Sequence, residues 1–117
     1  MTASLPPCFG QLPSPSLIVY PELIRSNIKR MLAISGDTAR VRPHIKTHKI
    51  PALAKLQIRA GAVGVTAQKI SEAEAIISEG GIDDILITYN IIGEKKLTAL
   101  RNLSKKVKVS VVADSSF

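Results

Sequence analysis

The chain alternates between short apolar runs and longer segments in which apolar residues recur every three or four positions. The apolar runs predict five β-strands, at residues 17–20, 41–46, 64–68, 84–89 and 107–114. The longer segments between them predict four helices, which begin near Pro21, Pro51, Ser71 and Gly93. Strands that alternate with helices favour parallel pairing through right-handed crossovers, so the pattern predicts an α/β fold.

The ends of the predicted helices carry residues that commonly start and stop helices. Pro21 and Pro51 suit first-turn positions, and Ser71 and Glu74 have the spacing of a capping box with Ser71 as N-cap. The glycines that follow the helices are Gly36, Gly61, Gly80 and Gly81. The residues expected to face inward are Ile24, Ile28, Met31 and Leu32; Leu53, Leu56 and Ala60; Ile70, Ala73 and Ile77; and Leu97, Leu100 and Leu103. Residues 1–14 are rich in proline and predict an irregular arm, and residues 15–117 form the α/β unit.

Composition narrows the classes of function. A formal charge of +7 ordinarily favours nucleic-acid binding, but the cations are spread along the predicted helices. Aromatic residues make up 3% of the chain and tryptophan is absent, which argues against base-stacking surfaces. The chain has one cysteine, no apolar run of about 20 residues and no signal-peptide pattern. We therefore expect a cytoplasmic protein that binds neither nucleic acid nor membrane; a basic α/β nucleic-acid-binding module is the alternative from a different class.

The densest chemistry lies in residues 42–49, Arg-Pro-His-Ile-Lys-Thr-His-Lys, which contain both histidines of the chain. Read as a strand, this stretch points Arg42, His44 and Lys46 to one face, and Val41, Pro43 and Ile45 to the other. Lys46 would stand at the carboxyl end of the strand, where α/β folds place their chemistry. A solvated basic loop or a phosphate contact is the simpler interpretation of such a stretch.

Lys46 is the candidate nucleophile. Burial and the neighbouring cations would lower its pKa, and a neutral amine can form a Schiff base with an aldehyde cofactor such as pyridoxal phosphate. His44 would lie one layer deeper, near the cofactor. His48, in the following loop, could meet a substrate carboxylate or shuttle a proton. The two histidines have no acidic or cysteine partner nearby, so we predict no metal site.

Polar residues at the ends of later strands could line the same site. Gln68 could hydrogen-bond the cofactor, and Tyr89 or Asn90 could face its ring. Asp114 could orient a histidine or an arginine. Ordinary turn chemistry explains each of these residues equally well.

The spacing of residues 42–49 resembles the cofactor-lysine motif of the D-threonine aldolase and D-serine dehydratase family. These are pyridoxal-phosphate enzymes of the alanine-racemase-like fold type. The resemblance runs from residues 15–19 through residues 64–74 to Asp114. It implies that Lys46, rather than Lys49, carries the cofactor. The cofactor-binding residues that we expect are Lys46, Arg42, His44, Gln68 and Tyr89, and the catalytic residues are Lys46, His44 and His48.

The resemblance also implies a fold and an activity. The fold is the first half of a (β/α)8 TIM-like barrel, incomplete in this chain because such barrels take about 250 residues; a complete open sheet is the alternative. The activity is that of a lyase which cleaves a small-molecule D-β-hydroxy amino acid to glycine and an aldehyde. D-serine dehydratase, amino-acid racemase and non-catalytic pyridoxal-phosphate binding stay open as alternatives. A divalent metal would come only from a missing C-terminal domain, so we expect this chain alone to be inactive and the full-length protein to be a homodimer.

Overall fold

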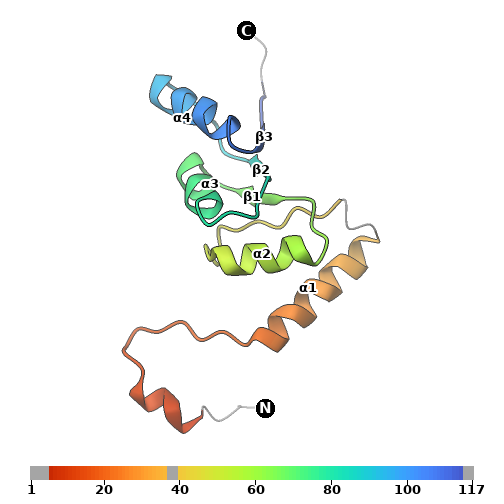
Figure 1. Ribbon diagram of the computed structural model, residues 1–117, viewed down its shortest axis with the longest axis vertical. Coiled ribbons are helices and arrows are strands. Elements are labelled where there is room, and N and C mark those ends of the chain that lie inside the picture. The colour runs from red at the N-terminus through yellow and green to blue at the C-terminus, as the bar shows by residue number, and fades with distance from the viewer. Residues whose placement is uncertain (1–5, 37–39, 115–117) are drawn as a thin grey trace.

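A computed structural model describes residues 6–36 and 40–114 (Figure 1). The helices are the 3₁₀ helix η1 (Pro7–Gln11), α1 (Pro21–Ser35), α2 (Pro51–Arg59), α3 (Ile70–Ile77) and α4 (Glu94–Ser104). The strands are β1 (Val65–Ala67), β2 (Asp84–Ile87) and β3 (Lys108–Val111). The four predicted α-helices are confirmed, and the arm that was expected to be irregular contains η1. No helix within the described ranges is long and apolar enough to cross a lipid bilayer.

The three strands form one parallel sheet in the order β1-β2-β3. Helices α2, α3 and α4 are stacked along one side of this sheet (Figure 1). Val65 and Ala67 of β1 and Ile85 and Ile87 of β2 are fully buried against them, whereas Leu86, which points to the opposite face, is only half-buried. The core therefore lies between one face of the sheet and a single layer of helices, as expected when parallel strands follow one another in sequence order.

The first two predicted strands are not strands in the structure. Residues 17–20 are extended but pair with no strand, and Leu17 is 75% exposed. Within residues 41–46, only an isolated parallel bridge between His44 and Thr66 forms, and the chain turns directly afterwards. A strand needs a partner for its backbone groups, and neither segment has a partner along its full length among the described residues.

The predicted C-terminal end of α1 is confirmed, whereas the predicted N-terminal end of α3 is wrong. α1 ends at Gly36, whose φ of 70° is the left-handed conformation that the helix C-cap requires. The capping-box prediction at α3 is wrong, because the N-cap is Lys69 and the helix begins at Ile70. The residue in the third helical position is therefore Glu72, and its carboxylate reaches back to the backbone N–H of Gln68.

The helices bury their apolar faces unequally. α2 buries Ala54 in the core instead of the predicted residues, because its Leu56 and Ala60 line a groove shared with α1. α4 buries Leu103, but Leu97 is 41% exposed. α1 buries no side chain completely and leaves Met31 58% exposed. Helix periodicity located each apolar stripe, but which part of the stripe is covered depends on the neighbouring elements.

Gly64 provides a test of the packing at the start of β1. A Cβ atom at this position would lie 2.7 Å from the guanidinium of Arg42 and against the backbone oxygen of Asp84. We expect Gly64→Ala to lower the free energy of unfolding by about 1–3 kcal/mol, the usual cost of overpacking. Urea denaturation measures this loss. Gly10→Ala is the matched control because nothing lies within 4 Å of its Cβ position, and equal stability of the two variants would contradict the prediction.

Candidate functional site at the carboxyl end of the sheet

The segment that carries Lys46 is attached to β1 by its backbone. The N–H of Thr66 donates to the carbonyl of Pro43 over 2.7 Å, and the N–H of Ile45 donates to the carbonyl of Thr66 over 2.9 Å. The Ile45 side chain is fully buried in the core, as predicted. His44 therefore faces the sheet surface that the helices do not cover, and Lys46 lies in the turn just beyond.

The three fixed cations of the segment have different partners. Arg42 pairs with Asp84, the first residue of β2, at the amino end of the sheet. Lys49 pairs with Glu72, with 2.7 Å between Nζ and Oε1. The Lys46 side chain is exposed, and its Nζ makes no ion pair or hydrogen bond within the part of the chain that the structure describes. Lys46 is therefore exposed and not buried as we predicted, because the chain turns directly after His44 instead of continuing as a strand. Of the three cations, Lys46 alone has no charged partner among the described residues. The position of Arg42 favours a structural role over the cofactor contact that we predicted.

The two histidines accept hydrogen bonds from the backbone. The Nδ1 of His44 accepts from the N–H of Lys46 over 3.2 Å, and the Nδ1 of His48 accepts from the N–H of Ile50 over 3.0 Å. Burial lowers the pKa of His44, the positive charge of Lys46 lowers it further, and the carboxylate of Glu72 opposes both. Burial also lowers the pKa of His48. Each neutral ring therefore carries its proton on Nε2.

His48 is less accessible than its predicted role at the mouth of the site requires. Its Nε2 is buried, and so is the Oε1 of Gln57 in α2. The Gln57 side chain opposes the lowering of the His48 pKa as a hydrogen-bond partner, so the ring lies against α2. The His48 ring is directed into the structure, so this position favours packing against α2 over contact with a substrate.

The acidic partners of this segment keep their charge at neutral pH. The hydrogen bond from Lys49 is the main cause that lowers the pKa of Glu72, and the hydrogen bond from Arg42 does the same for Asp84. Because both pKa values lie below those of free carboxyl groups, the stability that the pairs contribute is fully present at neutral pH. It is lost as the pH falls through the lowered values.

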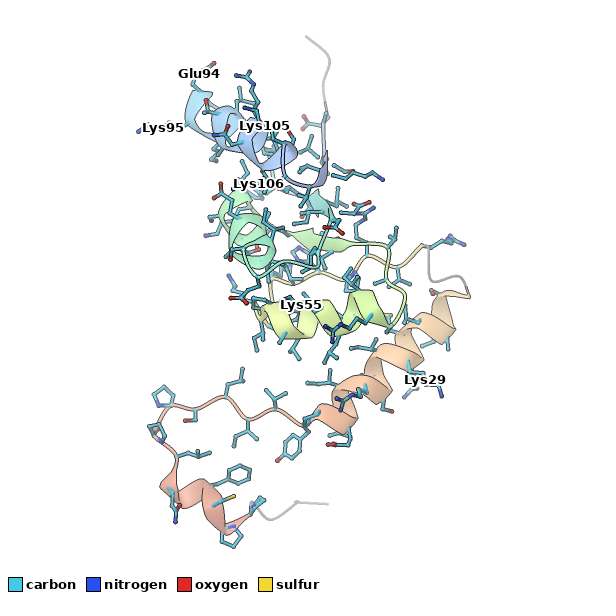
Figure 2. The ribbon with its side chains drawn as sticks, in the orientation of Figure 1. Lys29, Lys55, Glu94, Lys95, Lys105 and Lys106 are labelled. Carbon is cyan, nitrogen blue, oxygen red and sulfur yellow. The ribbon has the colours of Figure 1, made fainter. Side chains whose placement is uncertain are left out.

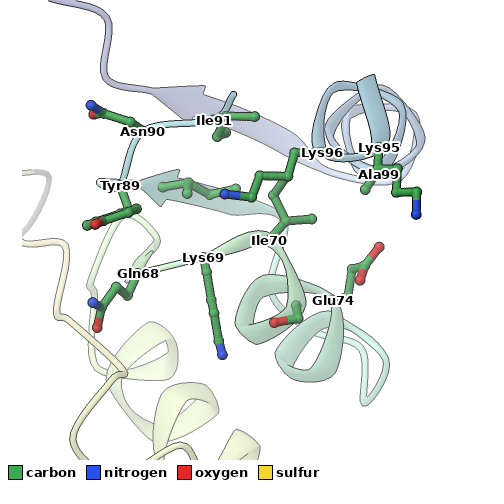
Figure 3. A pocket seen from close by; sticks show the side chains of 12 residues that line it. Gln68, Lys69, Ile70, Glu74, Tyr89, Asn90, Ile91, Lys95, Lys96 and Ala99 are labelled. Carbon is green, nitrogen blue, oxygen red and sulfur yellow. The ribbon is translucent and has the colours of Figure 1, made fainter. Parts of the chain in front are cut away.

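Gln68 and Tyr89 line a pocket of about 290 Å³ between the starts of α3 and α4. Figure 3 shows both side chains at the same end of this pocket, beyond the ends of β1 and β2. Asn90 and three lysines, Lys69, Lys95 and Lys96, also line it. Gln68, Tyr89 and Asn90 are thus brought together, but the lining includes neither Asp114, which is exposed, nor Lys46 and the two histidines.

Lys108 of β3 shares Asp84 with Arg42, with 3.1 Å between Nζ and Oδ2. Most of the other cations are dispersed over the helices. Figure 2 shows Lys29 on α1, Lys55 on α2 and Lys105 at the end of α4, well separated from one another. In the described ranges, no three histidine, cysteine, aspartate or glutamate side chains are grouped as a metal site would need.

The chain resembles lyases of D-β-hydroxy amino acids in sequence. The D-threonine aldolase of an Arthrobacter species is 36% identical over 109 residues, which cover 92% of this chain and 28% of that enzyme. The 3-hydroxy-D-aspartate aldolase of Paracoccus denitrificans is 38% identical over 102 residues, covering 82% of this chain and 25% of the enzyme. The D-threo-3-hydroxyaspartate dehydratase of a Delftia species is 30% identical over 105 residues, covering 89% of this chain and 27% of the enzyme.

The fold agrees with the sequence comparison. The crystal structure of D-threonine aldolase from Filomicrobium marinum superposes with a TM-score of 0.81 at 37% identity, covering 89% of this chain and 28% of that one. The chain is a homologue of the D-threonine aldolases. This homologue spans about a quarter of the length of the relatives that it matches. No model of a known protein family matches it.

Sequence reasoning missed the role of Glu72 in this aldolase homologue. The capping-box prediction named Ser71 and Glu74 and gave Glu72 no role, yet Glu72 is one of two buried polar or charged side chains among the described residues, the other being Thr66. Its partner Lys49 lies 23 positions earlier in the chain. No local pattern signals such a pair. The available hint was an acidic residue beside the apolar stripe of a helix.

The electrostatic coupling of Lys46 and His44 can be measured directly. The chain has two histidines, so proton NMR should show two titrating Cε1–H signals, each with a pKa below the ordinary value of 6.5. We expect Lys46→Met to raise the pKa of one signal, that of His44, because a neighbouring positive charge is removed. His44→Asn assigns the signals. Equal pKa values in Lys46→Met and the parent chain would contradict the proximity of the two side chains.

Proposed function

We propose that Lys46 binds pyridoxal 5′-phosphate covalently and that this chain forms part of a lyase acting on D-β-hydroxy amino acids. The observation that carries the proposal is that the three fixed cations of residues 42–49 have different partners. Arg42 and Lys49 are held by carboxylates, and the amine of Lys46 is exposed and unpaired within the described residues. Condensation with an aldehyde needs a free primary amine, which the other two side chains do not offer.

The residues around Lys46 suit such a cofactor. His44 faces the same uncovered side of the sheet, and its neutral ring can donate a hydrogen bond from Nε2. Gln68 and Tyr89 follow β1 and β2 and line the pocket described above, whose lining does not include Lys46. In this proposal the cofactor extends from Lys46 over the carboxyl end of the sheet toward these two side chains. Bound pyridoxal phosphate supplies an electron sink for negative charge that develops at the substrate Cα.

The favoured reaction is retro-aldol cleavage, because two of the relatives described above are aldolases. A base accepts the proton of the β-hydroxyl group, the Cα–Cβ bond breaks, and the former β-carbon leaves as an aldehyde. A proton then returns to Cα, which gives glycine. His44 is our candidate for holding or moving a proton near the amine, through its Nε2.

Dehydration of the same class of substrate is the second candidate, because one relative is a dehydratase. In that reaction the α-proton and the β-hydroxyl group leave as water. The position of Lys46 serves both reactions equally.

The sheet supports a (β/α)8 barrel over an open sheet. The strands follow one another in sequence order, and the helices cover one face only. A doubly wound open sheet would have to reverse its strand order and place helices on the other face beyond these strands, whereas a barrel continues the arrangement seen here. We therefore propose that the chain supplies the first strands of a barrel. In this proposal further chain completes the phosphate site and any divalent-metal site, and the complete enzyme is a homodimer.

Selective modification of Lys46 tests the cofactor assignment. After incubation of the 117-residue chain with pyridoxal phosphate and borohydride reduction, mass spectrometry should locate the adduct chiefly on Lys46. Lys46→Arg should lose this adduct, since a guanidinium is not a nucleophile at neutral pH. Lys105→Arg, which alters an exposed lysine just after α4, should keep it. Adducts distributed evenly over the surface lysines would overturn the assignment.

Competition by amino acids tests the substrate class. A bound substrate amine displaces Lys46, so a preferred substrate should protect Lys46 from reductive modification. In the complete enzyme that contains this chain, we expect D-threonine to protect at lower concentration than L-threonine, and D-alanine, which lacks the β-hydroxyl group, to protect least. Equal protection by the two threonine enantiomers would contradict a site for D-β-hydroxy amino acids.

A further inference from the structure

Glu72 is a buried carboxylate to which the mechanism above assigns no role. Its side chain is 8% exposed and lies in the first turn of α3. Oε1 accepts a hydrogen bond from the Nζ of Lys49 over 2.7 Å, and Oε2 accepts one from the backbone N–H of Gln68 over 3.0 Å. A single carboxylate therefore joins the loop after Lys46 to the residue that follows β1.

We propose that Glu72 is a positioning residue that holds the turn carrying Lys46 against the carboxyl end of β1. The inference deepens the proposed function, because it matters for chemistry only if Lys46 binds the cofactor. Glu72 acts through Lys49 and makes no contact with Lys46 itself.

The two ends of the turn are fixed in different ways. At its start, Ile45 is fully buried and bonded through its backbone to Thr66. At its end, the N–H of Lys49 donates to the carbonyl of Ile45 over 2.9 Å, and the Lys49 side chain is held by Glu72. Lys46 lies between these two points with its amine free, so release of Lys49 would loosen the turn from one end.

The backbone of Lys49 shows why this end needs support. Its φ of 51° is in the left-handed region, and Lys49 is the one non-glycine residue with positive φ among the described residues. This conformation is strained for a residue with a Cβ relative to ordinary backbone. The ion pair with Glu72 offsets part of that strain and stabilises the turn in this shape.

If Glu72 only capped α3, the contact of its Oε1 with Lys49 would be unexplained. An acidic residue in the first turn stabilises a helix through its dipole and can accept from a nearby N–H. The contact of Oε2 with Gln68 fulfils that role. Oε1 faces away from the cap and binds a loop 23 residues earlier, and the Glu72 charge also raises the pKa of His44 against the effects of burial and Lys46.

Three variants of the 117-residue chain separate these roles. Glu72→Gln keeps an oxygen acceptor for the Gln68 amide but removes the charge. Lys49→Met removes the other partner of the pair and leaves Glu72 in place. Glu79→Gln is the control, because it removes the same charge from an exposed side chain just after α3.

Two measurements need no cofactor. We expect Glu72→Gln and Lys49→Met to speed hydrogen exchange of the Lys49 amide about two- to fivefold, the effect of losing an ion pair with one exposed partner. The double variant Glu72→Gln/Lys49→Met should exchange the Lys49 amide little faster than either single variant, because both changes break the same ion pair. Glu72→Gln should also lower the pKa of His44 in an NMR titration. Glu79→Gln should alter neither quantity, and exchange within β1 and β2 should stay unchanged in all three variants.

A third measurement connects the turn to the chemistry. The rate at which pyridoxal phosphate and borohydride modify Lys46 should fall in Glu72→Gln and Lys49→Met by a factor similar to the gain in exchange, and should be retained in Glu79→Gln. Unchanged Lys49 exchange in Glu72→Gln would overturn the positioning role, as would faster exchange spread evenly over the sheet. If Glu72→Gln does not fold, Lys49→Met decides by the same criteria. Failure of the parent chain to modify Lys46 would instead overturn the proposed function, while exchange and titration still decide whether Glu72 holds the turn.

Discussion

The backbone pairing of residues 43–45 with Thr66 is the constraint on which the candidate site depends. Its two hydrogen bonds attach a polar, cationic segment to β1. The side chains of β1 that face the helices, Val65 and Ala67, are fully buried. Ile45 sets the rotation of the segment, because burying its side chain under the helices turns His44 to the other face of the sheet. The chain then turns, which leaves Lys46 exposed just beyond the bridge to β1. In parallel α/β folds the carboxyl end of the sheet is where functional groups collect. The core, rather than the charges of the segment, thus fixes where the amine lies.

Carboxylates from distant parts of the chain decide which cation stays free. Residues 42–49 contain three fixed cations, Arg42, Lys46 and Lys49. Their charges alone do not distinguish them from one another. Asp84 and Glu72 distinguish them, since each is largely buried and a buried carboxylate needs a cationic partner. The pairing also separates the cations in space, because Asp84 is at the amino end of β2 and Glu72 at the start of α3. These ion pairs leave Lys46 as the one cation of the segment without a charged partner among the described residues.

Sequence patterns predicted the helices of this chain better than its strands. Helix signals are local: Pro21, Pro51 and Gly36 act through their own backbone, and the helices begin or end where these residues indicate. Strands depend on partners, so residues 17–20 and 41–46 had suitable composition and yet formed one isolated bridge. The same distinction holds in the site. The motif around Lys46 was recognisable from sequence, whereas the pairing of Lys49 with Glu72 and the turn of His48 toward α2 depend on contacts between separate elements.

The uncovered face of the sheet favours the barrel over an open sheet on physical grounds. The register aligns His44, Thr66, Leu86 and Ser110 across this face, a row that mixes polar and apolar groups. Parallel sheets are normally covered on both faces, and a helix packed here would have to bury His44 and Ser110 against apolar side chains. Closing the sheet on itself removes that difficulty, because polar side chains at the carboxyl end of a barrel can face a ligand instead of a core. Polar residues in this row are therefore unfavourable for an open, doubly covered sheet, but they suit the end of a barrel where Lys46 would meet its cofactor.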